Sequence, residues 1–308
     1  MSMLEFSIII PTINKNKGLA GNIRQLLLAV SKYNCEIILI NDNKERQIDL
    51  GFNAEKLFIY NGPGKGAASA RNFGVSKSRY NTIIFIDDDI VVPSKGLDTF
   101  LQKVFAHLPG VIFLPDWRYP EELMELCRKN AFGRFLIKHK FYCLAGYINR
   151  PEFKPNEVIP HDGVASYFLA LNKSLFLQVK GYNESIPFAG FEDHDLSSKL
   201  MKIPVQIYID SGFCVFHNEE DKIIPENWFK RIRNGAVTRR KAVEIGYKEL
   251  SLHYSFFKKL IYGVVLPFEK VLLRAAKSMG TLPLVDKATF SILKTITALN
   301  IYKGYTLK

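Results

Sequence analysis

Three consecutive aspartates, Asp87, Asp88 and Asp89, directly follow the apolar run at residues 83–86. Neighbouring carboxylates repel one another, so a cation would stabilise such a triplet. Oxygen ligands at the end of a strand suit Mg²⁺ or Mn²⁺, particularly where the ion also contacts phosphates. A solvated acidic turn or a helix N-cap explains the same residues without a ligand. The triplet alone leaves both interpretations open.

A glycine-rich turn at residues 62–66 precedes a segment of small residues at 67–76. Backbone amides in a turn that opens a helix are suited to bind a diphosphate. The turn is not G-x-G-x-x-G, because residue 67 is alanine, and no Lys-Ser or Lys-Thr follows as in a Walker loop. An ordinary Gly/Pro turn before a helix is therefore the simpler interpretation of this motif alone.

A second acidic segment, GFEDHD at residues 190–195, begins a stretch with apolar residues at helical spacing. A helix dipole favours carboxylates in the first turn, and we expect it to keep Asp193 ionised. A carboxylate in that place is also suited to take a proton from a substrate hydroxyl as a general base. His217 follows the apolar run at residues 213–216 and is either structural or a metal ligand beside the aspartates.

The elements that position these motifs follow from hydrophobic periodicity. Apolar runs predict strands at residues 6–10, 36–40, 57–60, 82–86, 165–171, 205–209 and 213–216. Helical spacing predicts helices at residues 19–33, 67–76, 97–107 and 121–129, and a mainly helical region from residue 225 onward. Alternating strands and helices predict an α/β fold with a mostly parallel sheet, covered on both faces.

Polar residues follow the ends of three predicted strands, at Pro11-Thr12, Asn41-Asp42 and the aspartate triplet. In an open α/β sheet, ligands bind beyond the carboxyl ends of the strands. These three strand ends therefore predict one binding edge.

The composition is globular, with 47% hydrophobic and 23% charged residues, and the net charge is +12. Residues 1–224 hold 26 basic and 25 acidic residues, a net of +1, whereas residues 225–308 hold 16 and 5, a net of +11. This asymmetry predicts a nearly neutral body with a basic appendage, and no nucleic-acid binding. Four scattered cysteines and the absence of a signal-peptide pattern or a long apolar run predict a cytoplasmic protein without a transmembrane helix.

The basic appendage mixes aromatic and basic residues around Phe256, Phe257, Lys258 and Lys259. This mixture suits an interfacial helix on the cytoplasmic face of an anionic membrane. An amphipathic helix that packs on the catalytic domain with a solvated basic face explains it as well, and the two interpretations are not exclusive.

The order of the motifs resembles that of the family 2 glycosyltransferases, which are inverting enzymes of the GT-A fold. The resemblance covers roughly residues 6–217, and implies a catalytic domain at 1–224 followed by a basic, mainly helical region at 225–308. It rests on IIIPT at residues 8–12, INDN at 40–43, Gly66 with ARNFG at 70–74, FIDDD at 85–89, GYNE at 181–184 and GFEDHDL at 190–196.

The resemblance implies a role for each motif. Binding of the nucleotide sugar is implied for Pro11, Thr12, Asp42, Gly66, Arg71, Asp87 and Asp88. Asp89 and His217 are implied as ligands of Mn²⁺ or Mg²⁺, Asp193 as the catalytic base and Glu192 as a contact for the acceptor. The family usually has two acids where Asn41-Asp42 stands, followed by Gly-Ser where Asn43-Lys44 stands. The base contact through Asp42 is retained, and the nucleotide's identity stays open.

The function expected from the resemblance is the transfer of a sugar from a UDP-linked donor to a hydroxyl of a saccharide or lipid-linked acceptor, in polysaccharide or glycolipid biosynthesis. Two other classes of function remain as alternatives. A nucleotidyltransferase would also combine an α/β sheet with acidic metal ligands, but would release pyrophosphate instead of a nucleoside diphosphate. A non-enzymatic polyanion-binding protein is suggested only by the net charge.

Overall fold

The structure is a computed structural model that describes residues 4–186, 190–279 and 283–306. The chain divides into two compact units, Met1–Arg118 with Glu152–Asn218, and Tyr119–Pro151 with Glu219–Lys308. The sequence predicts a break near residue 225, but it does not predict that the segment Tyr119–Pro151 groups with the C-terminal residues.

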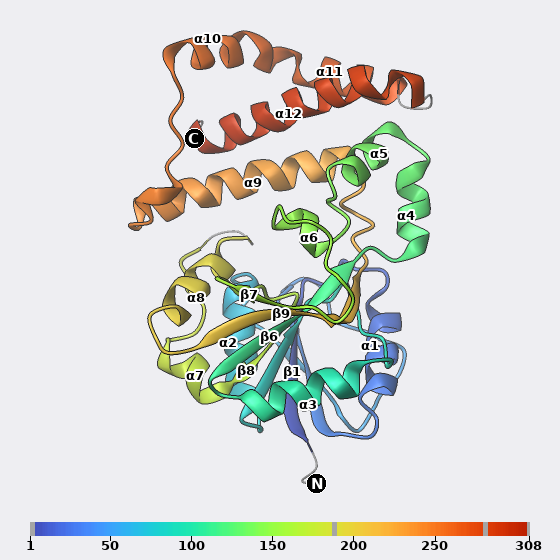
Figure 1. The fold of residues 1–308 in the computed structure, drawn as a ribbon, viewed down its shortest axis with the longest axis vertical. Coiled ribbons are helices and arrows are strands. Elements are labelled where there is room, and N and C mark those ends of the chain that lie inside the picture. Colours follow the sequence, from blue (N-terminus) through green and yellow to red (C-terminus); the bar gives the residue numbers. More distant parts are fainter. Residues whose placement is uncertain (1–3, 187–189, 280–282, 307–308) are drawn as a thin grey trace. The chain divides into compact units, whose positions relative to one another are not determined.

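The first unit is built on one sheet, which has nine strands in the described part of the chain (Figure 1). The strands are β1 (Glu5–Thr12), β2 (Asn34–Asn41), β3 (Leu57–Asn61), β4 (Thr82–Ile86), β5 (Ile90–Val91), β6 (Val111–Arg118), β7 (Val158–His161), β8 (Phe168–Asn172) and β9 (Gln206–His217). Their order is β3-β2-β1-β4-β8-β6-β9-β5, and β7 pairs with β9.

Parallel pairing joins β3, β2, β1 and β4, and also β6 with β9. The pairs β4 with β8, β8 with β6, and β9 with β5 and β7 are antiparallel. The predicted parallel sheet therefore comprises the strands that carry the three polar strand ends, inside a sheet that is mixed as a whole.

Strand β6 lies where the sequence predicts no strand. Pro115 interrupts its apolar run, and prolines within sheets are confined to edges and irregular positions. The register between β6 and β9 shifts between Pro115 and Asp116, which accommodates the proline. The two strands predicted at residues 205–209 and 213–216 form the single strand β9, whose partner residues jump from Asp210 to Cys214 at that shift.

Helices α1 (Leu19–Ala29), α2 (Ala67–Lys77), α3 (Leu97–His107), α7 (Lys173–Gln178) and α8 (Glu192–Leu200) complete the first unit. The small residues of α2 have a packing role. A Cβ atom at Gly74 would overlap Cγ2 of Ile9, so the glycine lets α2 approach strand β1 closely. That approach brings Arg71, on the same helix, to the carboxyl end of β4, where it contacts Asp87.

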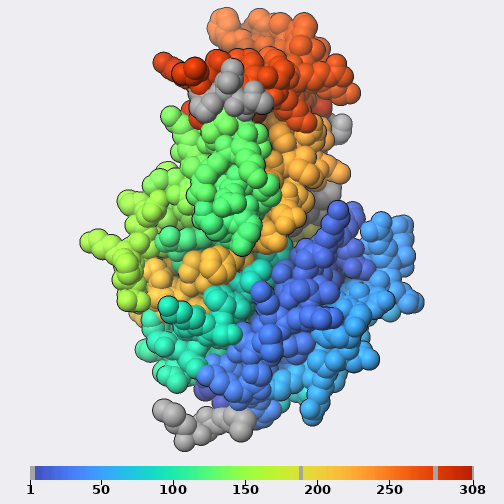
Figure 2. Space-filling model, turned by 90° about the vertical axis from the view of Figure 1, so that its right-hand side faces the viewer, coloured from blue at the N-terminus to red at the C-terminus, as the bar shows by residue number. Residues whose placement is uncertain are grey.

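The second unit is helical. Its helices are α4 (Glu121–Arg128), α5 (Ala131–Lys138), α6 (Leu144–Tyr147), α9 (Pro225–Glu244), α10 (Phe256–Val265), α11 (Glu269–Ser278) and α12 (Asp286–Thr306), with short 3₁₀ turns at Lys248–Leu250, Leu266–Phe268 and Pro283–Val285. In the space-filling view, α4 and α5 form one green patch of surface (Figure 2).

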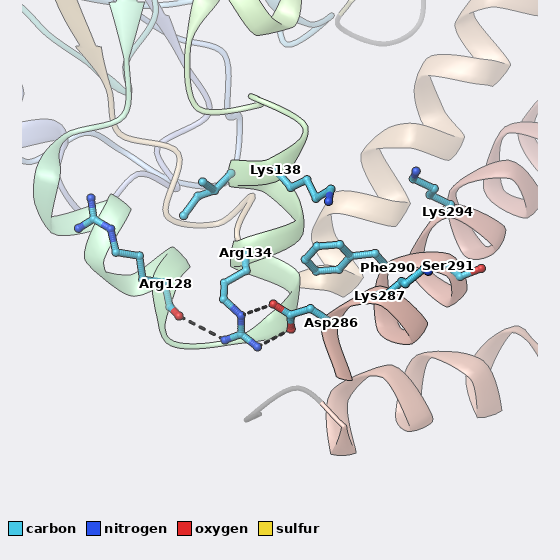
Figure 3. Close-up of a pocket in the computed structure, with 9 residues that line it drawn as sticks. Arg128, Arg134, Lys138, Asp286, Lys287, Phe290, Ser291 and Lys294 are labelled. Carbon is cyan, nitrogen blue, oxygen red and sulfur yellow. Dashed lines mark hydrogen bonds and ion pairs between the residues drawn. The ribbon is translucent and has the colours of Figure 1, made fainter. Parts of the chain in front are cut away.

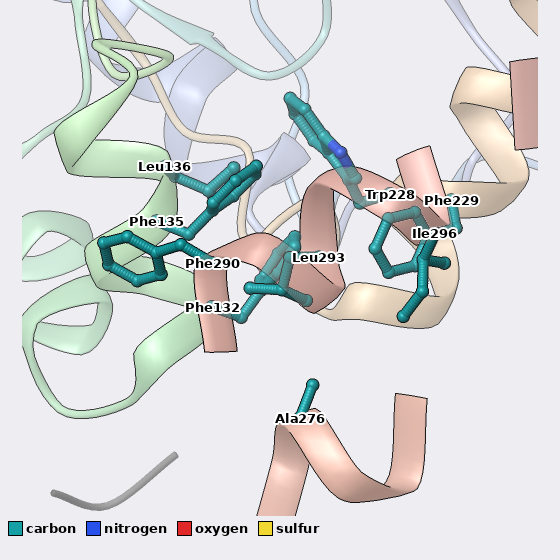
Figure 4. Close-up of a cluster of buried hydrophobic side chains, with 9 residues drawn as sticks. All are labelled: Phe132, Phe135, Leu136, Trp228, Phe229, Ala276, Phe290, Leu293 and Ile296. Carbon is teal, nitrogen blue, oxygen red and sulfur yellow. The ribbon is translucent and has the colours of Figure 1, made fainter. Parts of the chain in front are cut away.

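An apolar core joins α5, α9, α11 and α12 (Figure 4). It comprises Phe132, Phe135, Leu136, Trp228, Phe229, Ala276, Phe290, Leu293 and Ile296. Because α5 supplies three of these residues, the segment between β6 and β7 is part of the helical core. No helix among the described residues has the length and apolar character needed to cross a bilayer.

Candidate active site

The carboxyl ends of β1 and β4 are joined by a side-chain hydrogen bond. Thr12 Oγ1 at the end of β1 donates to Asp88 Oδ2 across 2.5 Å. The main-chain carbonyl of Asp88 also accepts hydrogen bonds from the side-chain amides of Asn16, at 2.6 Å, and Asn22, at 2.9 Å. The predicted binding edge is therefore a connected set of polar groups, and Thr12 is buried within it.

The next carboxylate of the triplet, Asp89, faces the end of β9. His217 Nε2 lies 3.1 Å from Asp89 Oδ1, and β5 pairs with β9 at Ile90 and His217. The Trp117 ring lies edge-on to the imidazole, with 5.0 Å between ring centroids. One carboxylate oxygen and one imidazole nitrogen thus converge, which is a donor set suited to Mn²⁺ and related divalent ions.

The first carboxylate, Asp87, pairs with a buried arginine. Arg71 Nη2 lies 2.6 Å from Asp87 Oδ1, Nη1 lies 3.4 Å from Glu192 Oε1, and the Arg71 side chain is only 4% exposed. Burial alone lowers the pKa of a guanidinium, but Asp87 and the other anionic neighbours raise the pKa of Arg71 well above its usual range. The three carboxylates therefore have three different partners, and do not depend on one shared cation.

The glycine turn is organised by Asp42. Its Oδ1 accepts from the Gly64 amide at 2.7 Å and its Oδ2 from the Gly66 amide at 2.6 Å. These two amides are bound to a carboxylate, so the turn is the N-terminal support of α2 and not an open cradle for a diphosphate. Gly66 has φ = 100°, a backbone conformation that requires glycine. Pro11, directly before Thr12, is buried where β1 pairs with Ile40 of β2.

Asp193, at the start of α8, is held by Ser166. The Ser166 hydroxyl donates to Asp193 Oδ1, and its main-chain amide donates to Oδ2 at 3.1 Å. Burial of the carboxylate and the nearby charge of Glu192 raise the pKa of Asp193 to about 7, although Arg71 and Ser166 act in the opposite direction. The expectation that the helix dipole keeps this group fully ionised is corrected, because desolvation outweighs the dipole here. A carboxylate with such a pKa exchanges protons near neutral pH.

Glu192, the neighbour of Asp193, is buried, with 4% of its surface exposed. One of its oxygens lies near Arg71, and the other accepts from the Gly190 amide at 2.5 Å. Both oxygens thus have partners inside the protein, and this placement supports the position of Arg71. The predicted contact with an acceptor remains a prediction.

Comparison with known proteins shows the enzyme class of the chain, which is that of the glycosyltransferases. Residues 7–142 match the sequence model described as glycosyl transferase family 2. This part of the chain is thus a glycosyltransferase domain that is similar to family 2. A curated "Uncharacterized glycosyltransferase" from Haemophilus influenzae is 23% identical over 224 residues, which are 70% of this chain and 70% of that protein.

Two solved structures share the GT-A fold of the glycosyltransferase. The structure of S. aureus TarS 1-349 has a TM-score of 0.51 and 14% identity, covering 98% of this chain and 89% of that one. The mannosyltransferase PcManGT from Pyrobaculum calidifontis, in complex with GDP-Man and Mn²⁺, has a TM-score of 0.55 and 11% identity, covering 98% and 87%. The family match decides against a nucleotidyltransferase and against a purely polyanion-binding protein.

Two residues that support the glycosyltransferase site are not predicted from the sequence as site residues. Ser166 binds both oxygens of Asp193, and its hydroxyl lies 2.7 Å from the Tyr182 hydroxyl. Tyr182 is held in turn by Asn72 of α2, whose side-chain amide makes two hydrogen bonds of 3.0 Å with the main chain of Tyr182. The motif that contains Tyr182 is visible in the sequence, but Ser166 has no local signal because its partner is 27 residues away.

Proposed function

We propose that this glycosyltransferase moves a sugar from a nucleoside diphosphate sugar to an acceptor hydroxyl with inversion, and that Asp193 is the general base. The observation that carries the proposal is the Asp193 carboxylate, oriented by Ser166 and with a pKa of about 7. A hydroxyl is a poor nucleophile, so a carboxylate must take its proton as the attack proceeds. Attack opposite to the leaving group inverts the anomeric centre and needs no second, nucleophilic carboxylate.

The donor is proposed to bind at the ends of β1, β2 and β4. Pro11, Thr12 and Asp42 would contact a uracil base. Gly66, which precedes α2, and Arg71, within α2, would lie near the nucleotide. Asp87 and Asp88 would approach the ribose and the sugar. Asp42 retains lone pairs beyond those used by the two glycine amides, which leaves it able to accept from a nucleobase.

Asp89 and His217 would hold a Mn²⁺ or Mg²⁺ ion. Their ligand atoms, 3.1 Å apart, fit this role in chemistry and in proximity. A divalent cation supplies electrostatic stabilisation of the negative charge on a diphosphate leaving group. The Mn²⁺ and GDP-Man in the similar mannosyltransferase structure support both the ion and the class of donor.

The acceptor is proposed to be a saccharide or a lipid-linked saccharide, in polysaccharide or glycolipid biosynthesis in the cytoplasm. This part of the proposal is supported by the exposed apolar helix described below, because lipid-linked acceptors are presented at a membrane.

The direct test is a screen of UDP- and GDP-linked sugars with the full chain, with Mn²⁺, with Mg²⁺ and with a chelator. We expect metal-dependent release of a nucleoside diphosphate, fastest with UDP-linked donors, and a product of inverted anomeric configuration by NMR. A product of retained configuration would refute inversion. Full activity in the chelator would refute the metal site, and faster turnover of GDP-linked sugars would refute the assignment of uracil.

We also propose that α10 attaches the enzyme to a membrane. Phe256, Phe257, Leu260, Ile261 and Val264 are each between 56% and 75% exposed. Phe256, Leu260 and Val264 follow one another at i, i+4 and i+8, and Phe257 and Ile261 lie one position further along, so all five share one face of the helix. No residue of α10 is buried. An exposed apolar face of this kind is typical of an interaction site.

The basic residues of α10 indicate an anionic lipid surface as the partner. Lys258 and Lys259 stand among the exposed apolar residues, a combination typical of helices that lie in the plane of the interface. On another side of the helix, Tyr262 contacts Tyr302 of α12, with ring centroids 5.0 Å apart. The helix is thus attached to the second unit through Tyr262, while its apolar face is left uncovered by the described chain.

Flotation with vesicles containing phosphatidylglycerol tests this attachment. Phe256→Ser with Leu260→Ser should abolish binding, because the insertion of two large side chains is lost. Leu28→Ser is the matched control, since Leu28 is 73% exposed on α1 of the first unit. If the wild-type protein ignores such vesicles at low salt, or if the control loses as much binding as the double variant, membrane attachment through α10 is refuted.

A further inference from the structure

A cavity of about 770 Å³ lies in the second unit between α4, α5 and α12 (Figure 3). All of its lining residues belong to this unit. They are Arg128, Arg134, Ile137, Lys138, Asp286, Lys287, Phe290, Ser291 and Lys294. The catalytic residues proposed above do not contribute to it, so the cavity needs an explanation of its own.

The charge of the lining is strongly unbalanced. The lining contains five basic side chains but a single carboxylate, that of Asp286. That carboxylate is engaged by Arg134 through two hydrogen bonds, 2.8 Å from Nε and 2.7 Å from Nη2. Arg128 has an exposed partner in Glu121, at 2.6 Å. The lining thus retains an excess of positive charge after its internal ion pair is formed.

Three lysines provide most of this excess. The ammonium groups of Lys138, Lys287 and Lys294 have no ion-pair partner in the part of the chain that the structure describes. Lys138 and Lys294 extend from α5 and α12 into the space between these helices (Figure 3). The pKa of His139 is lowered, mainly because the ring is partly buried and also because the charges of Lys294 and Lys138 lie nearby. Like charges gathered around one cavity repel, and a bound anion would relieve that repulsion.

The cavity also has an apolar surface. The ring of Phe290 and the side chain of Ile137 line it, and Lys138 Nζ lies 6.0 Å from the centroid of the Phe290 ring. Phe290 belongs to the buried core of the unit, so its position is fixed by packing against Phe135, with ring centroids 5.7 Å apart. The occupant must therefore match both a cationic rim and a rigid apolar wall.

We propose that this cavity binds a phosphate group carried on an apolar chain, as in a lipid phosphate. A phosphate offers strong acceptor oxygens to several ammonium groups, and the attached chain would cover Phe290 and Ile137. A basic pocket between helices with an apolar wall is complementary to both parts of such a molecule. This proposal goes beyond sugar transfer and does not depend on it, because binding is measured without donor or turnover.

Isothermal titration of the full chain with monomeric dihexanoyl phosphatidic acid, and separately with inorganic phosphate, tests the proposal. We expect the lipid phosphate to bind at least about tenfold more tightly than inorganic phosphate, since apolar contact adds to the charge-assisted hydrogen bonds. Equal binding of the two probes would overturn the apolar part of the proposal. Failure of both probes to bind would overturn the site.

The residues are tested by the double variant Lys138→Gln with Lys294→Gln. We expect at least about tenfold weaker binding of the lipid phosphate, because two charge-assisted contacts are lost. The matched control is Lys230→Gln with Lys248→Gln, which removes the same charge from exposed positions of the same unit. If both double variants lost the same affinity for the lipid phosphate, the loss would come from the lower net charge of the protein, and the proposed site would be refuted. Lys138→Arg with Lys294→Arg keeps the charge and should restore binding, and Lys287→Gln alone provides a second, milder variant.

Discussion

Charged groups are treated differently in the two units of the molecule. In the first unit, each carboxylate of the aspartate triplet has its own protein partner: Arg71 for Asp87, Thr12 for Asp88 and His217 for Asp89. In the second unit, three lysines around one cavity have no ion-pair partner in the described chain. The first arrangement holds side chains in place before any substrate arrives, whereas the second leaves charge available to a ligand. The contrast is therefore between side chains that the protein itself positions and charges that no ion pair within the described chain neutralises.

The largest effect expected from breaking the first arrangement is on turnover. Asp193→Asn keeps the shape of the side chain but cannot accept a proton, so kcat should fall by about 10²–10⁴-fold while the affinity for the donor stays nearly unchanged. Steady-state kinetics and donor titration measure the two quantities. Asp195→Asn, on the same helix and paired with Lys199 at 2.6 Å, is the control and should stay within a few-fold of the parent. Loss of donor binding in Asp193→Asn would make Asp193 structural.

Removal of a proposed metal ligand should come next. Asp89→Ala should lower transfer by about 10²–10³-fold, because charge on the leaving group is no longer stabilised by a positioned cation. Nucleotide binding measured with and without Mn²⁺ should lose its dependence on the metal. Unchanged activity with added Mn²⁺ or Mg²⁺ would contradict the assignment.

Replacement of the buried Arg71 tests how much its ion pairs with Asp87 and Glu192 contribute to the stability of the fold. Arg71→Met leaves Asp87 and the buried Glu192 without their cation, and breaking such a pair from one side costs about 3–5 kcal/mol of unfolding free energy. Urea denaturation followed by circular dichroism measures the loss. A cost below about 1 kcal/mol, as for a surface ion pair, would show that the carboxylates are not held by Arg71.

The pH dependence of the enzyme should report the pKa of Asp193. Because that pKa is raised to about 7, the base is protonated in acid, and kcat should fall about tenfold per pH unit below the pKa.

The effect of the Asp193 pKa on the stability of the fold has the opposite sign. The native state holds this proton more tightly than the unfolded chain, so its stabilising effect is full below the ordinary pKa of aspartate and is lost as the pH rises through 7. Asp193→Asn should remove this dependence, and an unchanged pH profile of stability would contradict it.

The smallest effect on stability is expected for an exposed residue of α10 in the second unit. Leu260 is 56% exposed on α10 and Leu293 is 1% exposed in the core of the same unit. Leu293→Ala should cost about 2–5 kcal/mol of unfolding free energy, and Leu260→Ala should stay within about 0.5 kcal/mol. Thermal or urea unfolding of the two variants gives the difference. Equal costs would mean that α10 contributes to the fold through its outer face and is not free for a membrane.

Most strands and the order of the motifs were predictable from the sequence, because buried strands and amphipathic helices leave their period in the chain. Strand β6 was not, since Pro115 interrupts its pattern and the register shift that accommodates the proline depends on the distant strand β9. Among the site residues, Asp89 and His217 lie 3.1 Å apart, and their role as metal ligands stays a prediction of the family resemblance. The support of Asp193 by Ser166 and of Asp42 by the glycine turn has no local signature.

The sequence by itself determined the α/β architecture of the first unit and the basic character of the C-terminal region, since these depend on spacing and composition. The order of its motifs carried the resemblance to the family 2 glycosyltransferases. Tertiary structure alone decided which partner each carboxylate has, and that the pKa of Asp193 is raised and not lowered by its surroundings. It also decided that Tyr119–Pro151 joins the C-terminal helices in one core. The physical reason is that periodicity is a local property of the chain, whereas desolvation, ion pairing and cavity formation depend on atoms that packing brings together from distant positions.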